Sequence, residues 1–183
     1  MHTHGEPSDG AVVRAVLAGD SEQYRLLVRR YQDVLYRHAY RMVGRADDAA
    51  DLTQRALVNG FRKLDRCRDP EKVGGWLFRI VANLCKDFLK SPRRQDVSVE
   101  ATGADVIDAA SPDDDLERAE VRRTVREALA RLSPEQREAF VLKHVEGRSY
   151  EEMTELLGAS KSALKMRVMR AREELQNLLK VYR

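Results

Sequence analysis

Cationic and hydroxyl-bearing residues gather in one short stretch near the C-terminal end of the sequence. They are Ser160, Lys161, Ser162, Lys165, Arg167, Arg170 and Arg172, and Met166 lies among them. Ammonium, guanidinium and hydroxyl groups donate to phosphate oxygens and base edges, and a methionine thioether offers an apolar contact to thymine methyls. The stretch therefore predicts a contact with duplex DNA. A solvated basic surface is the alternative for the cations, and a covering partner is the alternative for Met166.

A helix-turn-helix is expected to position this stretch. Ser149 and Glu152 have the spacing of a capping box, Gly158 can turn with positive φ, and Ser160 can cap a second helix. Apolar residues recur on that helix at steps of four and three, namely Leu164, Val168, Ala171, Leu175 and Leu178. They predict its buried face, and a packed helical hairpin without DNA binding is the alternative.

The other residues of that helix are assigned to the groove or to the phosphates by their position relative to the buried face. The residues predicted to enter the groove are Ser162, Lys165, Met166 and Arg170. Arg167 and Arg172 are assigned to the flanking phosphates.

A second cationic set lies on a predicted helix over 76–90. Its apolar residues share one face, and the other face carries Arg79, Asn83, Lys86 and Lys90. The loop over 65–75 adds Arg66 and Arg68. Trp76 is a possible stacking platform, but its place in the apolar pattern favours burial. This set predicts a further contact with nucleic acid.

An acidic helix precedes this set. Asp47, Asp48 and Asp51 begin it, where carboxylates favour the helix dipole, and Leu52, Ala56, Leu57 and Phe61 have core spacing. Another helix is predicted over about 21–43, with Gly44 as its C-cap.

Composition and charge bound the classes of protein that this sequence fits. It has 183 residues, of which 43% are hydrophobic, and no apolar run long enough for a membrane span or a signal peptide. Two cysteines outside any CxxC pair suit the reducing cytoplasm. His2 and His4 lack the further ligands of a metal site, and no nucleophile or phosphate loop indicates an enzyme or a cofactor.

The charge distribution divides the chain. Residues 91–118 hold 3 Lys or Arg against 8 Asp or Glu, together with several helix breakers. We therefore predict an all-α protein with two small helical domains, 11–90 and 119–183, joined by a flexible acidic linker over 91–118.

Several segments resemble region 2 and region 4 of bacterial extracytoplasmic-function sigma factors. The resemblance to region 2 rests on 27–31, 35–37, 48–54, 64–66 and 76–83. Region 4 is matched by 129–137, by the helix-turn-helix and by 170–175. These segments cover nearly the whole chain in the family's order.

The resemblance implies partners for each surface. Region 2 of this family docks on the β′ clamp helices of core RNA polymerase, which would involve Asp47, Asp48, Asp51, Leu52 and Gln54. The cationic set from Arg66 to Lys90 would read the minus-ten element and hold a flipped base, and the helix-turn-helix would read the minus-thirty-five element. Region 4 would also meet the β flap, although its apolar residues can equally be core. An anti-sigma factor is a further implied partner.

The resemblance also implies a role for the linker. In the family this segment threads the active-site cleft and the RNA exit channel, and a plain solvated tether is the alternative.

The sequence departs from the family pattern at a few positions. Arg55 follows Leu-Thr-Gln where an acid is common, Gly60 lies inside a predicted helix, and Met166 replaces a common serine. Two alternatives to a sigma factor stay open. A stand-alone helix-turn-helix regulator does not explain the acidic helix and the second cationic set, whereas Arg55 and Met166 give some support to a sigma-like decoy that binds an anti-sigma factor.

Overall fold

The computed structural model describes residues 6–91 and 116–180, and every regular element in these two ranges is helical. The predicted all-α fold is confirmed. The acidic linker predicted over 91–118 falls almost wholly outside the described residues, as do His2 and His4. None of the helices in the described ranges has the length and apolarity to cross a membrane.

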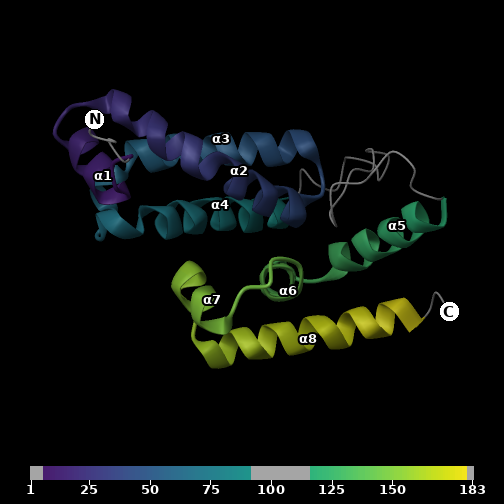
Figure 1. The fold of residues 1–183 in the computed structure, drawn as a ribbon. Coiled ribbons are helices and arrows are strands. Elements are labelled where there is room, and N and C mark those ends of the chain that lie inside the picture. Colours follow the sequence, from purple (N-terminus) through teal and green to yellow (C-terminus); the bar gives the residue numbers. More distant parts are fainter. Residues whose placement is uncertain (1–5, 92–115, 181–183) are drawn as a thin grey trace.

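The N-terminal half is a bundle of helices. It contains α1 (Asp9–Leu17), α2 (Tyr24–Val43), α3 (Ala46–Arg62) and α4 (Val73–Lys90), with the short 3-10 turns η1 (Ser21–Gln23), η2 (Leu64–Arg66) and η3 (Pro70–Lys72). The helices α2, α3 and α4 lie side by side, and α1 packs at one end of the bundle (Figure 1). Leu27, Leu35, Leu52 and Leu77 are at most 1% exposed. Burial of each such side chain contributes about 1.5–3 kcal/mol.

The helix boundaries differ little from those predicted. Gly44 caps α2 with a φ of 78°. The helix α4 begins at Val73, before the predicted start at residue 76, because Gly74 and Gly75 form part of its first turn. The helix α1 was not predicted. The expectation that Phe61 belongs to the core is wrong: it is 43% exposed and meets the edge of Tyr24, because the preceding residue takes the inward position.

That preceding residue, Gly60, marks a close approach of α3 to α4. A Cβ here would lie 2.4 Å from Leu77 Cδ2 and 2.8 Å from the Tyr24 hydroxyl. The hydroxyl donates to the Leu57 carbonyl over 2.8 Å, so it cannot move away without losing this bond. A glycine that costs about 1 kcal/mol in helix propensity is therefore required by packing.

Gly60→Ala is expected to destabilise the protein by about 1–3 kcal/mol, because overpacking exceeds the gain in helix propensity. Urea unfolding followed by circular dichroism measures the change. Gly75→Ala is the matched control, since nothing lies within 4 Å of a Cβ at that position. If both substitutions raised stability equally, the tight α3–α4 contact would be disproved.

The C-terminal half contains the predicted helix-turn-helix. Its elements are α5 (Leu116–Arg131), α6 (Pro134–Phe140), the π-helical turn η5 (Val141–Val145), α7 (Tyr150–Leu157) and α8 (Lys161–Lys180). Ser149 Oγ accepts from the Glu152 amide at 3.1 Å, which is one bond of the predicted capping box. Gly158 has a φ of 65°, and Ser160 Oγ accepts from the Ala163 amide at 3.3 Å.

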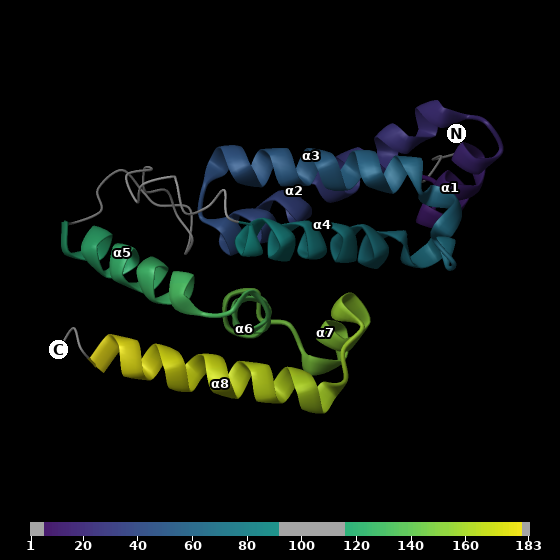
Figure 2. The same cartoon turned by 180° about the vertical axis from the view of Figure 1, so that it is seen from behind.

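The two halves pack against each other. Leu142, Met153 and Leu164 belong to the same buried cluster as Leu77 and Val81 of α4. Both views show α6 and α7 between α4 and α8 (Figures 1 and 2). A smaller cluster joins α5 to the C-terminal part of α8. Packing therefore fixes α7 and the start of α8 relative to α4.

Candidate functional site

The outer side of α8 carries most of the residues predicted to read duplex DNA. We define the α8 surface as its exposed members, Ser160, Lys161, Ser162, Lys165, Met166, Arg170 and Arg172. Lys161 pairs with Glu151 of α7, and the Lys165 ammonium lies 5.8 Å from the centroid of the Tyr150 ring. Such exposed contacts are screened by water and contribute little, so DNA phosphates can replace them.

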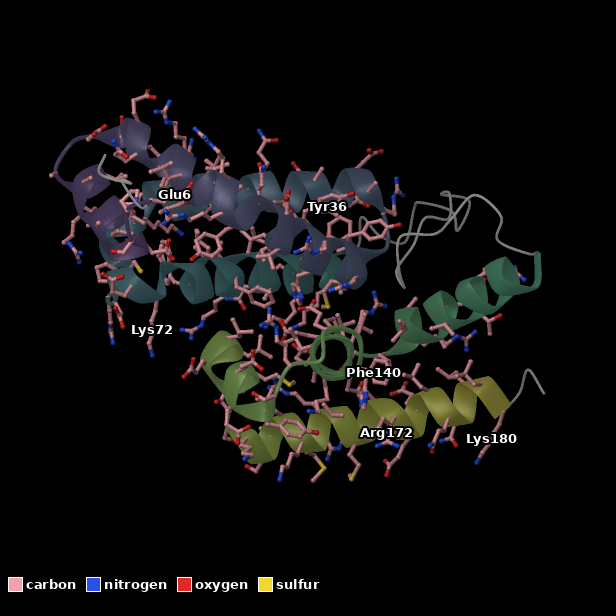
Figure 3. All side chains as sticks on the ribbon, viewed as in Figure 1. Glu6, Tyr36, Lys72, Phe140, Arg172 and Lys180 are labelled. Carbon is pink, nitrogen blue, oxygen red and sulfur yellow. The ribbon has the colours of Figure 1, made fainter. Side chains whose placement is uncertain are left out.

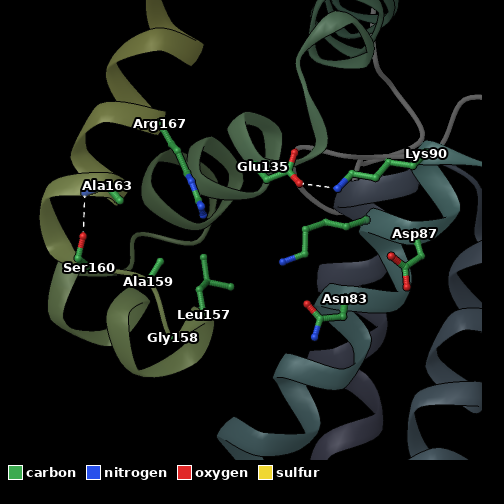
Figure 4. A pocket seen from close by; sticks show the side chains of 11 residues that line it. Asn83, Asp87, Lys90, Glu135, Leu157, Gly158, Ala159, Ser160, Ala163 and Arg167 are labelled. Atoms are coloured by element: carbon green, nitrogen blue, oxygen red, sulfur yellow. Dashed lines mark hydrogen bonds and ion pairs between the residues drawn. The ribbon is translucent and has the colours of Figure 1, made fainter.

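Arg167 does not belong to this surface. It is half-buried and lines a hollow between α4 and α8. Figure 4 shows its side chain pointing into that hollow. Because Arg167 precedes buried Val168 by one residue, it stands beside the buried face of the helix. Its predicted role at the flanking phosphates does not fit this orientation.

Arg79 on α4 bonds to the C-terminal end of α7. Its Nη2 donates to the Glu155 carbonyl at 2.9 Å, and its Nε donates to the Leu156 carbonyl at 3.4 Å. The last carbonyls of a helix lack partners within the helix and carry partial negative charge. The guanidinium therefore satisfies the helix end that precedes the helix-turn-helix glycine.

Lys86 and Lys90 also bond to the C-terminal half. Lys86 Nζ lies 3.2 Å from Glu138 Oε2, and Lys90 Nζ lies 2.6 Å from Glu135 Oε1. Burial raises the pKa of Glu138, although the charge of Lys86 opposes this. The hydrogen bond from Lys90 lowers the pKa of Glu135. Glu135 and Glu138, the two carboxylates of α6, are thus each paired with a lysine of α4.

Asn83 completes this face of α4, and we call Arg79, Asn83, Lys86 and Lys90 the α4 surface. Asn83 lines the hollow, which has a volume of about 710 Å³ and is bounded by α4, α6 and the turn between α7 and α8. Figure 4 shows Asn83 and Lys90 on one wall, with Ser160 on the other. The C-terminal half therefore bonds to Arg79, Lys86 and Lys90 of the α4 surface, while Arg79, Asn83 and Lys90 stay exposed beside the hollow.

The loop that leads into α4 holds the remaining predicted contacts. Arg66 and Arg68 are exposed. Trp76 is half-buried and packs against the core, in agreement with the favoured expectation.

A buried charged cluster between the halves could not be anticipated from the sequence. His38 is fully buried, and its Nδ1 lies 3.0 Å from Glu146 Oε1, which is 3.4 Å from Arg41 Nη1. Burial acts to raise the pKa of Glu146, but the His38 hydrogen bond and the charges of His38, Arg41 and Arg148 outweigh it and lower the pKa. The ionised carboxylate therefore stabilises the contact at neutral pH, and this is lost as pH falls through the lowered pKa.

Arg137 makes a second buried contact between the halves. It is 4% exposed, and its Nη1 donates to the Met42 carbonyl of α2 at 2.7 Å. Its Nε donates to the Leu129 carbonyl at 2.8 Å. The guanidinium thereby ties the end of α2 to the end of α5.

The outer face of α3 carries the acidic residues predicted to dock on a partner. Asp47 and Gln54 are exposed, while Asp48 pairs with Arg45 at 3.0 Å and Asp51 pairs with Arg55 at 3.4 Å. Leu52 is 1% exposed, so the prediction that it contacts a partner conflicts with its place in the core.

Two apolar residues extend that acidic face and were missed by the sequence reasoning. Val58 and Phe61 are 40% and 43% exposed. Figure 3 shows side chains projecting outward along α3. The helical period could have revealed them. Val58 follows Asp47, Asp51 and Gln54 at steps of three and four, so it belongs to the same exposed face. We call this whole face, with Asp48, the α3 surface.

The described residues offer little for metal or thiol chemistry. No group of three or more His, Cys, Asp or Glu side chains within 6–91 and 116–180 could hold a metal ion. Cys67 and Cys85 are free and buried, and burial raises the pKa of Cys85 to about 12.

Two family models match this chain, one on each half. Sigma-70 region 2 matches residues 27–95, and Sigma-70, region 4 matches residues 122–175. The chain is similar to the ECF RNA polymerase sigma factor SigE of Mycolicibacterium smegmatis, with 34% identity over 183 residues, 95% of this chain and 70% of that protein. Its identity to the ECF RNA polymerase sigma-E factor of Haemophilus influenzae is 28% over 179 residues, 93% of this chain and 94% of that protein.

Solved structures show the same arrangement of helices. CnrH in complex with the cytosolic domain of CnrY gives a TM-score of 0.64 at 28% identity, covering 96% of this chain and 99% of that chain. The sigma factor RpoE in complex with the anti-sigma factor NepR from Bartonella quintana gives a TM-score of 0.60 at 30% identity, covering 90% and 99%. Both similarities extend over the two halves.

Proposed function

We propose, from the premise that this chain belongs to the extracytoplasmic-function (ECF) sigma factors, that three of its surfaces divide the work of promoter recognition. The protein is an alternative sigma factor that binds core RNA polymerase and directs transcription initiation at specific promoters. In the proposal the α3 surface docks on the β′ clamp helices, the α4 surface captures the minus-ten strand with Arg66 and Arg68, and the α8 surface reads the minus-thirty-five duplex. The chain acts in the cytoplasm, and region 4 also meets the β flap.

The observation that carries this division is the presence of two cationic faces, one on each half of the chain. A stand-alone helix-turn-helix regulator needs the α8 surface alone. Such a regulator does not require the α4 surface or the acidic α3 surface with its exposed Val58 and Phe61. Carboxylates at one end of a helical face and exposed apolar side chains at the other suit a basic helical partner such as the clamp.

Asp51→Arg is expected to weaken binding to core polymerase about tenfold, because it reverses a charge within the α3 surface and removes the partner of Arg55. Arg55→Glu should strengthen binding by adding an acid to the same face. Fluorescence anisotropy of the labelled protein titrated with core polymerase gives both affinities. Glu22→Arg, an exposed reversal on η1, is the control and should change nothing. Equal effects from all three variants would rule out a local docking site on α3.

The α4 surface needs a change of arrangement before it can act. Arg79, Lys86 and Lys90 bond to the C-terminal half, so a DNA strand has to compete with these bonds while the halves are packed together. We propose that core polymerase separates the halves and that the promoter strand then replaces Glu135, Glu138 and the end of α7. An anti-sigma factor is the proposed inhibitor, because one that holds the halves together keeps Arg79, Lys86 and Lys90 bonded to the C-terminal half.

A promoter library tests the proposed function as a whole. The purified protein is mixed with core polymerase and random promoters, and run-off transcripts are sequenced. Transcripts that depend on the protein and share two spaced elements are expected. DNA binding without any such transcript would contradict the sigma factor function and support a stand-alone helix-turn-helix regulator. Binding of an anti-sigma factor without transcription would indicate a decoy.

A further inference from the structure

Two exposed methionines lie on the outward side of α8, on or beside the centre line that stands opposite its buried face. Leu164, Val168, Ala171 and Leu175 are at most 7% exposed and define the inner direction of the helix. Since successive residues turn by about 100°, Ser162, Met166 and Glu173 point most nearly opposite and mark the outward centre line, and Met169 stands about 50° to one side of it. Met166 is 45% exposed and Met169 is 46% exposed. Figure 3 shows sulfur atoms on the edge of α8 that faces away from the other helices.

Cations flank this methionine pair on both sides. Lys165 and Arg172 follow one side of the centre line, and Arg170 follows the other. A protein partner that covered two thioethers would not require positive charge on both sides. The walls of the DNA major groove are phosphates, and its floor is made of base edges. The charge pattern of α8 therefore matches a groove, with the methionines over the floor.

The floor of the major groove has one apolar group, the C5 methyl of thymine. A thioether packs on a methyl through dispersion and exclusion of water, and its flexible side chain adapts to the contact. Met166 and Met169 are separated by about 4.5 Å along the helix axis, close to the rise of about 3.4 Å between base pairs. The pair can therefore contact methyls on neighbouring base pairs.

We propose that Met166 and Met169 are specificity-determining residues that select thymine methyl groups in the minus-thirty-five element. This rests on the proposed function, in which α8 enters the major groove. Lys165 and Arg170, predicted from the sequence to enter the groove, contact its phosphate walls in this proposal, and the thioethers discriminate thymine from the other bases by its methyl group. Met169 thereby joins the α8 surface as a residue that the sequence reasoning did not select.

Deoxyuridine tests the proposal because it removes only the C5 methyl. The full-length protein with core polymerase is bound to a promoter from the library, and each minus-thirty-five thymine is replaced in turn. We expect a loss of binding of about threefold to tenfold at one or two thymines. The Met166→Ser variant and the Met169→Ser variant should each lose the preference at one thymine position, so that each binds DNA with thymine and DNA with deoxyuridine at that position equally. Leu179→Ser, which removes another exposed apolar side chain of α8, should keep the full sensitivity.

The outcomes separate this proposal from the proposed function. Promoter-dependent transcription with no sensitivity to deoxyuridine overturns the methyl contact and leaves the sigma factor intact. Sensitivity that persists in both methionine variants also overturns it. Variants that bind DNA normally but lose binding to a protein inhibitor would make the pair a protein-docking patch instead. Absence of any protein-dependent transcript counts against the proposed function itself.

Discussion

Replacing Arg79 and Asn83 together by Ala is expected to reduce run-off transcription from a duplex promoter at least about tenfold, with binding to upstream duplex DNA almost unchanged. Unpairing a base costs a few kcal/mol, and the sigma factor recovers this only through contacts to the extruded strand. Both residues lie on the α4 surface, where Arg79 now bonds to α7 and Asn83 faces the hollow. Their loss removes the contacts that compensate for melting.

Arg79→Ala also has a second effect, which should raise transcription and can be distinguished from the loss of strand capture. Removing Arg79 also loosens the contact between the halves, which should expose the α4 surface and favour transcription. A net decrease therefore measures the role of these residues in strand capture. A template with mismatched strands across the melted region should restore most of the activity, because no base pair has to be broken.

Lys165→Ala is the matched variant on the other half. It should weaken binding to the minus-thirty-five duplex severalfold and should respond little to a mismatched template, because a phosphate contact on duplex DNA is unaffected by melting. Gel-shift titrations and run-off transcription distinguish the two defects. The same defect in both variants would refute the division of labour between α4 and α8.

Features set by local sequence were predictable. The capping box of Ser149 and Glu152 and the helix ends at Gly44 and Gly158 depend on residues within a few positions, and the all-α fold follows from apolar spacing over single helices. Residues at the edge of a helical face were less predictable. Phe61 and Arg167 each stand about one residue from a buried position, and the neighbouring helix decides which side they face. Periodicity locates a face but not the element that covers it.

Contacts between the halves could not be predicted at all. His38 and Glu146 are 108 positions apart, and neither is distinguished in the sequence from an ordinary surface residue. The same holds for Arg79, which the sequence assigns to DNA and the structure bonds to α7. A cation suited to a phosphate is equally suited to the carbonyl end of a helix or to a glutamate. The α4 surface can therefore serve two mutually exclusive ligands.

Joining the halves across the hollow is expected to abolish transcription reversibly. Asp87 and Ala159 line opposite walls of the hollow and belong to none of the three surfaces, so cysteines placed there can be linked by a reducible bismaleimide. The native thiols are buried and should not react. The halves of a linked protein cannot separate, so core polymerase cannot shift the protein to the arrangement with separated halves. Transcription should fall at least about tenfold and return when the linker is reduced.

The control for this experiment is a link that does not cross between the halves. Asp33→Cys with Arg37→Cys places the same reagent across one turn of α2, at two exposed positions, and should leave transcription unchanged. Full activity of the linked Asp87–Ala159 variant would show that the packed arrangement is already competent, and the contacts of Arg79, Lys86 and Lys90 would then have to be compatible with a bound strand. Loss of activity with both links would assign the effect to the reagent. Loss with the first link alone means that the glutamates of α6 and the carbonyl end of α7 compete with the minus-ten strand for the same cations.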